Sequence, residues 1–259
     1  MKEHQEIISG YLECDGIIVK VSSWNDVNNF ITRFGNSVNQ ITEEELNKLT
    51  YNEFDSDGFP RRNVDEVDDC GVSYIFNPLT ICKGSGVMNY NVKDGTIAIG
   101  GRAFDDSIRY VYNYGKLKAL QMPNSVKAIG YKAFNRNKDL SNLKLSENLI
   151  MIAESAFSEC ESLVDLKLPN GLLYIGASAF YGCGIQSVIV PASLKKLGSH
   201  AFAECKDLKS VRFEGVPEYI GSGIFDNCSI ESVVVPEEKI DFFKKSLFPI
   251  PINKIKTTN

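Results

Sequence analysis

The sequence is poor in the residues that build metal centres and catalytic sites. It contains 2 histidines in 259 residues, His4 and His200, and none of its 7 cysteines belongs to a C-x-x-C pair. Zinc sites need Cys and His at short, fixed spacings, and nucleophilic catalysis needs a nucleophile beside a base. We therefore predict no metal, no cofactor and no catalytic residue, and we expect a protein that is not an enzyme.

The chain also lacks a strong excess of positive charge. Its net charge is -5, and residues 1–95 hold 8 Lys and Arg against 16 Asp and Glu, whereas residues 96–259 hold 20 against 17. A nucleic-acid-binding surface requires a much larger basic excess, so nucleic acid is not an expected partner. The uneven distribution of charge indicates two modules.

Long apolar runs are absent as well. A membrane-spanning helix needs about 20 predominantly apolar residues, and no stretch of the sequence approaches this length. The first residues, MKEHQEIISGYLECDGIIVKV, include acidic residues early and no apolar run of signal-peptide length. The sequence as written therefore predicts no membrane insertion and a cytoplasmic location.

What the sequence does contain is a repeat. Six phenylalanines recur at intervals of 30, 23, 23, 22 and 23 residues, and five of them follow an alanine. An Ile-Gly pair or a close variant lies five and four residues before each Phe, and the last four copies have Cys three residues after it. Fixed spacing of this kind is typical of stacked coils that share one continuous core. The predicted buried ladder consists of Phe104, Phe134, Phe157, Phe180, Phe202, Phe225, Cys160, Cys183, Cys205 and Cys228.

Each copy also contains a short stretch of alternating apolar residues, usually closed by proline. These stretches read ALQMP, NLKLS, DLKLP, SVIVP, SVRFE and SVVVP. Alternation with period two predicts a half-buried strand, and proline ends it because it has no N–H for the next ladder position. The same register extends upstream to MNYNV, so we place about seven coils in residues 88–236, between a module at 1–87 and a C-terminal segment at 237–259.

The repeat resembles the BspA-like leucine-rich repeat family. Residues 163–183 carry the pattern L-x-x-L-x-L-P-x-x-L-x-x-I-G-x-x-A-F-x-x-C almost intact. The resemblance implies an α/β repeat solenoid, a right-handed superhelix with a parallel sheet on its concave face. It also implies a protein displayed on a microbial cell surface or secreted, which binds host or neighbouring proteins, in contrast to the cytoplasmic location expected above.

Alternate residues of the strands point away from the core and should line the concave groove. We predict that this outward row binds a protein partner, and the alternative is an ordinary solvated sheet face. The row mixes basic and apolar side chains, a combination that suits protein contact. It consists of Asn91, Gln121, Lys144, Lys167, Ile189, Arg212 and Val234.

The cysteine column allows two interpretations, a reactive or cross-linked set of thiols and a packed one. Equivalent side chains of neighbouring coils lie about 4.8 Å apart and point in parallel, whereas a disulfide needs Cβ atoms about 3.8 Å apart with a defined dihedral angle. Packing as a small buried hydrophobe is therefore favoured. A nucleophile–base pair of Cys205 with His200 is disfavoured, because Cys205 belongs to the column.

The two ends of the chain do not repeat. Ile240, Phe243 and Leu247 stand at helical spacing and predict a capping helix, followed by an irregular tail. In the first 87 residues Asp15-Gly16 predicts a hairpin, SSWNDVNNFITRFG and TEEELNKL predict helices, and GVSYIF predicts a strand. A small α+β capping module is the expectation.

The leading hypothesis is a non-enzymatic protein-protein interaction module, either of the adhesion type or an intracellular adaptor. The alternative is a repeat scaffold that carries an N-terminal ligand-binding or catalytic domain. The sequence does not identify the partner or the oligomeric state.

Overall fold

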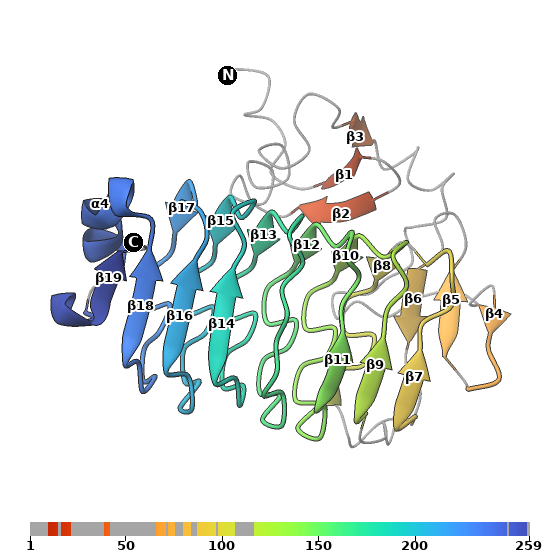
Figure 1. Cartoon of the computed structure of the whole chain (residues 1–259). Helices are drawn as coiled ribbons and strands as arrows, with labels where there is room; N and C mark the ends of the chain where they lie inside the picture. Colours follow the sequence, from red (N-terminus) through yellow and green to blue (C-terminus); the bar gives the residue numbers. More distant parts are fainter. Residues whose placement is uncertain are drawn as a thin grey trace.

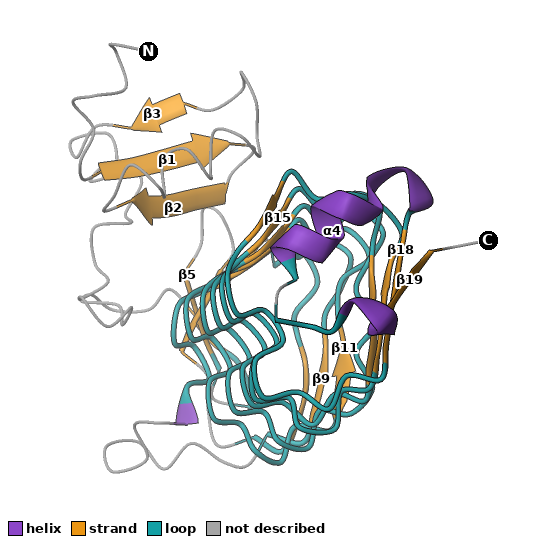
Figure 2. Cartoon of the chain, turned by 90° about the vertical axis from the view of Figure 1, so that its left-hand side faces the viewer, coloured by secondary structure: helices purple, strands orange, loops and turns teal. Residues whose placement is uncertain are grey.

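The chain folds into a solenoid in which successive coils stack side by side (Figure 1). The structure is a computed structural model, and it describes residues 10–14, 17–21, 39–41, 66–70, 72–75, 80–83, 87–96, 98–106, 117–247 and 249–257. Six coils each contain one turn centred on a Phe of the repeat, and the seventh predicted coil, which β18 opens, continues instead into a helix. Viewed from its C-terminal end, the solenoid is a stack of similar rings (Figure 2).

One side of the solenoid is formed by the strands that the alternating stretches predict, and we call it the outward sheet. It has two parallel parts, β7-β9-β11 and β14-β16-β18-β19, and a single bridge from Asp165 to Ser187 joins the intervening coil to the second part. Equivalent residues of neighbouring coils pair in register. The strands are β7 (Asn89–Asn91), β9 (Ala119–Gln121), β11 (Asn142–Lys144), β14 (Ser187–Val190), β16 (Ser210–Phe213), β18 (Ser232–Val235) and β19 (Ile255–Thr257).

A second parallel sheet, which the sequence analysis did not anticipate, runs along the Ile-Gly positions of the repeat. Each of its strands has only two residues, too short to show alternation with period two. It therefore left no sequence signal of its own. Its strands are β8 (Ala98–Ile99), β10 (Ala128–Ile129), β12 (Met151–Ile152), β13 (Tyr174–Ile175), β15 (Lys196–Leu197) and β17 (Tyr219–Ile220).

The glycine that follows these short strands allows the coils to approach one another. A Cβ atom added to Gly176 would lie 2.4 Å from the backbone nitrogen of Glu154 in the preceding coil, and one added to Gly198 would lie 2.4 Å from that of Ala177. Such a contact is far inside van der Waals distance, so a side chain would force the coils apart. The Ile-Gly pair is therefore a close-packing position, with Ile in the core and Gly at the backbone contact.

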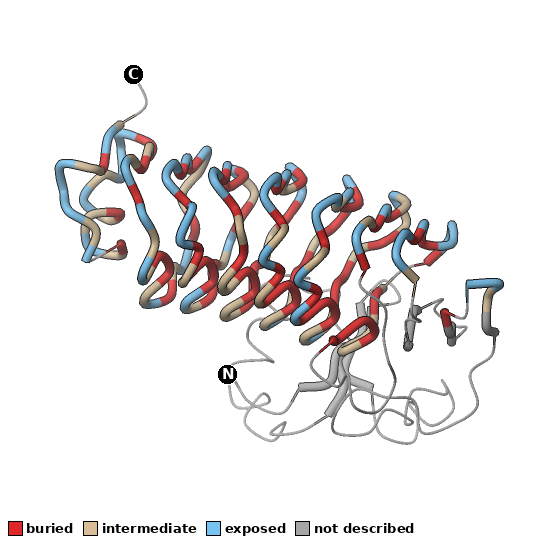
Figure 3. The backbone as a smooth tube through the Cα atoms, turned by 90° about the horizontal axis from the view of Figure 1, so that it is seen from below, coloured by how far each residue is buried: buried red, intermediate tan, exposed pale blue. Residues whose placement is uncertain are grey.

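The core is one continuous cluster along the inside of the coils, as the buried segments in Figure 3 show. Most coils contribute a leucine or valine from the outward-sheet position, the Ile or Leu of the short strand and an Ala-Phe pair; the first coil has Tyr90 at the strand position, and the sixth has Ile224 before its Phe. In the fourth coil these residues are Leu163, Leu166, Leu172, Ile175 and Phe180. A coil of this size cannot bury such a face alone, which explains why the coils must stack.

The C-terminal end of the solenoid is closed by a helix and by an additional strand. After η4 (Glu237–Lys239), helix α4 (Ile240–Ser246) buries Phe243, whose ring lies 4.8 Å from that of Phe213. The predicted capping helix is thus present. The prediction of an irregular tail is wrong: after η5 (Ile252–Lys254), β19 pairs in parallel with β18 and satisfies its exposed edge.

At the N-terminal end, β4 (Glu66–Val67), β5 (Ser73–Ile75) and β6 (Thr80–Lys83) extend the second sheet, with β6 parallel to β8. The predicted strand in GVSYIF is β5. Strands β1 (Gly10–Cys14), β2 (Ile17–Val21) and β3 (Asn39–Ile41) form a separate antiparallel sheet. Cys14 pairs with Ile17 across two residues, which confirms the hairpin predicted at Asp15-Gly16. The two predicted N-terminal helices lie outside the described residues.

Candidate interaction surface

The predicted partner-binding residues form one row along the outward sheet. Asn91 pairs with Gln121 and Gln121 with Lys144 in the first part of the sheet, and Ile189 pairs with Arg212 and Arg212 with Val234 in the second. Lys167 lies between the two parts, two residues after Asp165. All members of the row are exposed except Val234, which is half-buried, so the structure brings the whole predicted set to one face.

The row is basic and partly apolar. Lys144, Lys167 and Arg212 carry its charge, it contains no acidic residue, and the Ile189 side chain is 54% exposed. In the described part of the chain, no acidic side chain forms an ion pair with these three cations.

Several other exposed cations of the coils form ion pairs between neighbouring coils. Lys138 pairs with Glu161 at 2.6 Å and Lys195 with Glu218 at 2.7 Å, each reaching the equivalent turn of the next coil. Lys209 and Glu231 do the same at 3.2 Å. These pairs join neighbouring coils, whereas the three cations of the row form no such pair in the described residues.

A second row of mostly small polar residues runs parallel to the first, two positions earlier in each strand. Asp165 is its only acidic member, and the others leave little steric bulk beside the row of larger side chains. This flanking row consists of Asn89, Ala119, Asn142, Asp165, Ser187, Ser210 and Ser232.

Sequence reasoning missed one residue that continues the row. Lys256 lies on β19 opposite Val234 and is exposed, so it adds a fourth cation at the C-terminal end. The missed signal is the alternation of Ile255, Lys256 and Thr257 after Pro251, a short strand pattern that the expectation of an irregular tail concealed.

The Phe residues of the repeat lie inside the coils, stacked one upon the next. Successive rings from Phe104 to Phe225 have centroids 5.0 to 6.0 Å apart, and their planes are inclined by 2 to 22°. Offset stacking of this kind contributes about 0.5 to 1.5 kcal/mol per pair beyond burial. These residues carry the fold and contribute nothing to an exposed site.

The cysteine column has a hydrogen-bonding role in addition to packing. Cys160 Sγ lies 3.3 Å from the carbonyl oxygen of Phe134, and Cys183, Cys205 and Cys228 make the same contact with the Phe one coil back at 3.1, 3.1 and 3.0 Å. Each thiol is the donor. In an earlier coil Asn137 Nδ2 makes the equivalent bond to the Phe104 carbonyl at 2.5 Å. Each of these side chains thus donates a hydrogen bond to the Phe carbonyl group of the preceding coil.

Burial keeps three thiols of the column protonated. Desolvation raises the pKa of the Cys183 and Cys205 thiols well above the ordinary value, and raises the pKa of Cys228 to about 12. A thiol is nucleophilic and metal-binding only as thiolate. His200, the candidate base beside Cys205, lies instead with its Nε2 3.8 Å from Asp226 Oδ2, while Cys205 donates to Phe180. The geometry therefore provides no nucleophile–base pair at this position.

Within the described residues, His, Cys, Asp and Glu nowhere gather in a group of three or more that could hold a metal ion. Over the same residues, every helix is too short or too polar to cross a membrane.

Comparison with known proteins supports the architecture. The chain matches the family model of the BspA type leucine rich repeat region in six copies, over residues 106–160 and 129–252. No curated protein sequence matches it significantly.

Among solved structures, a leucine rich repeat protein from T. pallidum has a TM-score of 0.56 and 23% identity, and the match covers 71% of this chain and 97% of that one. A leucine-rich repeat protein from Bacteroides ovatus has a TM-score of 0.52 and 22% identity, and the match covers 67% of this chain and 47% of that one. A leucine rich cell surface protein from Faecalibacterium prausnitzii has a TM-score of 0.50 and 26% identity, and the match covers 62% of this chain and 41% of that one. The match thus spans less than half of the latter two proteins.

The six matched copies extend over more than half of the sequence, and they coincide with the coils that the structure stacks. The chain belongs to the BspA-type leucine-rich repeat family.

Proposed function

We propose that the chain is a non-enzymatic protein-protein interaction module that binds an acidic surface of a partner protein through the outward row. The observation that carries this proposal is the row itself: Lys144, Lys167 and Arg212 lie exposed on one sheet face, with no ion pair to the described residues. Exposed Ile189 in their midst offers apolar contact area, and aliphatic and cationic side chains together suit an interface better than either alone.

The adhesion type of interaction is favoured over an intracellular adaptor. One of the solved structures with the same fold is described as a cell surface protein, at 26% identity over 62% of this chain. The family resemblance points the same way. The partner is then a protein of another cell or of the same cell surface, met outside the cytoplasm.

The proposal is tested by reversing the charge of the row. A variant with Lys144→Glu, Lys167→Glu and Arg212→Glu should lose binding to the proteins that the wild-type chain captures from host or neighbouring-cell extracts. Since these side chains are exposed and form no described ion pair, the free energy of unfolding should change by less than about 0.5 kcal/mol per site.

The matched control carries Lys206→Glu, Lys239→Glu and Lys245→Glu, which change the net charge equally at exposed positions outside the row. It should capture the same proteins as the wild type. Equal loss of binding in both triple variants would show that binding depends on net charge and not on the row. Unchanged binding in the row variant would reject the row as the binding site.

A further inference from the structure

The coils are joined on their turn side by a repeated set of three hydrogen bonds. In each coil the N–H groups of the Phe and of the residues two before and two after it donate to carbonyl groups of the next coil. Five successive junctions show this pattern, with N···O distances from 2.6 to 3.0 Å. At the last junction His200, Phe202 and Glu204 donate to Ser222, Ile224 and Asp226.

The sixth turn has the same three donors and no coil to receive them. Within the described chain, no carbonyl group accepts from the N–H groups of Gly223, Phe225 or Asn227. Gly223 and Asn227 have positive φ, as the equivalent residues of earlier turns do, so the turn has the shape that presents these donors along the solenoid axis. On the outward-sheet side the end is closed, because β19 pairs with β18. The turn column is left open, and β17 is the last strand of the second sheet at this end.

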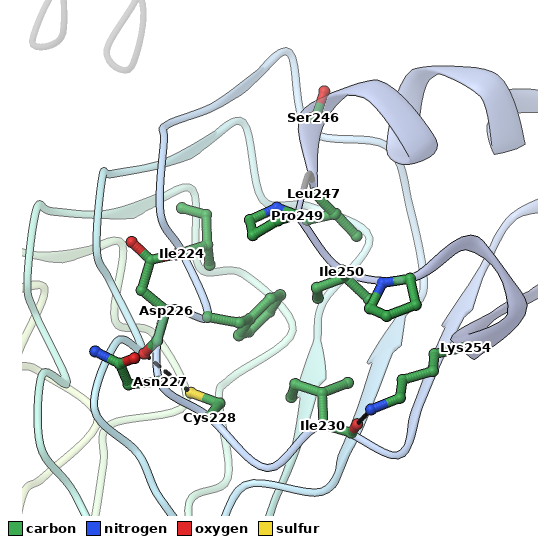
Figure 4. A pocket seen from close by; sticks show the side chains of 12 residues that line it. Ile224, Asp226, Asn227, Cys228, Ile230, Ser246, Leu247, Pro249, Ile250 and Lys254 are labelled. Atoms are coloured by element: carbon green, nitrogen blue, oxygen red, sulfur yellow. Dashed lines mark hydrogen bonds between the residues drawn. The ribbon is translucent and has the colours of Figure 1, made fainter.

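A cavity of about 330 Å³ lies against this open turn, between the last coil and residues 246–254 (Figure 4). Ile224, Phe225 and Ile230 line it from the coil, and Leu247, Pro249 and Ile250 line it from the opposite side. Lys254 donates to the Ile230 carbonyl at 2.6 Å and holds the wall in place. Asp226, Asn227 and Ser246 add polar groups to the lining. Three N–H donors therefore stand beside a space of mixed lining that is large enough for an aromatic side chain.

We propose that this open end of the turn column binds a segment of a partner protein that imitates one further Ala-Phe turn. Its backbone carbonyl groups accept from Gly223, Phe225 and Asn227, and its aromatic side chain fills the cavity as the next ring would. The spacing of the donors, one at every second residue, matches the carbonyl groups of every second residue of such a turn, which Ser222, Ile224 and Asp226 supply at the preceding junction.

The residues opposite the last coil determine whether the cavity admits a short segment or a whole coil. Leu247, Pro249 and Ile250 lie across the cavity from the last coil, where the remainder of a following coil of full width would have to stand. A complete coil of a second copy is therefore excluded by bulk, whereas a single turn of another protein fits. This site is at the end of the solenoid and is independent of the outward row.

The test uses the full chain and a peptide with the sequence of residues 199–207, SHAFAECKD, under reducing conditions. Titration followed by amide chemical shifts should move the signals of Gly223, Phe225 and Asn227. A control peptide with Ser in place of its Phe should bind at least tenfold more weakly, because it leaves the cavity unfilled.

Two protein variants complete the design. Ile250→Trp fills the cavity and should weaken binding at least tenfold while the melting temperature stays near that of the wild type. The row variant with Lys144→Glu, Lys167→Glu and Arg212→Glu should bind the peptide like the wild type, which separates this site from the proposed function.

Absence of shifts at the three amides, or equal affinity for both peptides, would overturn the proposal. Self-association of the chain in sedimentation experiments without peptide, abolished by Ile250→Trp, would make a second copy the occupant and would overturn it as well.

Discussion

Cys183 donates its thiol proton to the carbonyl oxygen of Phe157, 3.1 Å away in the preceding coil. The acceptor belongs to the residue whose ring stacks on Phe180 of the thiol's own coil, 5.4 Å away. One side chain thus satisfies a buried polar group and fills the space beside the ring, so the Ala-Phe-x-x-Cys motif is a unit of coil-to-coil contact.

Removal of this donor should be costly. Cys183→Ala leaves the Phe157 carbonyl without its thiol partner and creates a small cavity, so we expect a loss of about 1 to 3 kcal/mol in the free energy of unfolding. Urea denaturation measures it, with the exposed Ser210→Ala as a control that should change stability by less than about 0.5 kcal/mol. Equal stability of the two variants would show that neither the hydrogen bond nor the packing of the thiol contributes to stability.

The protonated thiols predict a loss of stability at alkaline pH. Burial raises the pKa of Cys183, Cys205 and Cys228 above the value of 9.0 that applies in the unfolded chain. Below pH 9 both states hold the protons and the contribution is constant; above it the unfolded state releases protons first, so the stability falls as the pH rises toward about 12. Each thiol contributes up to about 1.4 kcal/mol per pH unit.

Urea denaturation at pH 8, 9 and 10 measures this slope. Other groups also titrate in this range, so the comparison is with Cys205→Ala, which has one buried thiol fewer and should show a shallower decline. An identical slope in the variant would mean that the thiols ionise equally in both states.

The phenylalanine stack should respond strongly to truncation at its centre. Phe157→Ala removes a fully buried ring that contacts Phe134 and Phe180, and we expect a loss of about 3 to 5 kcal/mol. Thermal and urea unfolding provide the measurement. Ile252→Ala truncates a side chain that is 64% exposed, and it should change the free energy of unfolding little. A comparable loss in this control would show that the loss in Phe157→Ala does not come from burial of the ring.

The turns contain residues whose backbone favours glycine. Ser155 has φ of 55°, in the left-handed region that strains side chains with a Cβ. Ser155→Gly should therefore stabilise the chain by up to about 1 kcal/mol. The neighbouring Glu154→Gly has no such strain to relieve and should destabilise by increasing the entropy of the unfolded chain. Destabilisation by both substitutions would show that the turn tolerates Ser155 without strain.

Hydrogen exchange should distinguish the last turn from the one before it. Phe202 N–H donates to Ile224 at 3.0 Å, whereas no described carbonyl accepts from Phe225 N–H. We expect exchange of the Phe225 amide at least about tenfold faster, since it needs no opening of a hydrogen bond. Equal protection of the two amides would indicate that the end of the turn column is closed in solution.

The regular part of the molecule follows from the sequence because its contacts are repeated at one spacing. The recurring Phe, Cys and Ile-Gly positions predict the stacked coils, and alternation in stretches such as SVRF determines which side chains face out, including Lys144, Lys167 and Arg212. Each coil contacts only its neighbours about 23 residues away, so a local pattern carries the information.

Only the tertiary structure determined the features that depend on the interaction partner of a residue in a neighbouring coil. These features all depend on which group each backbone N–H or C=O meets. They are the thiol acceptors, the second sheet at the Ile-Gly pairs, Lys256 at the end of the row and the open donors of Gly223, Phe225 and Asn227. Periodicity records which side chains are apolar, but it does not record where each backbone N–H and C=O finds its partner.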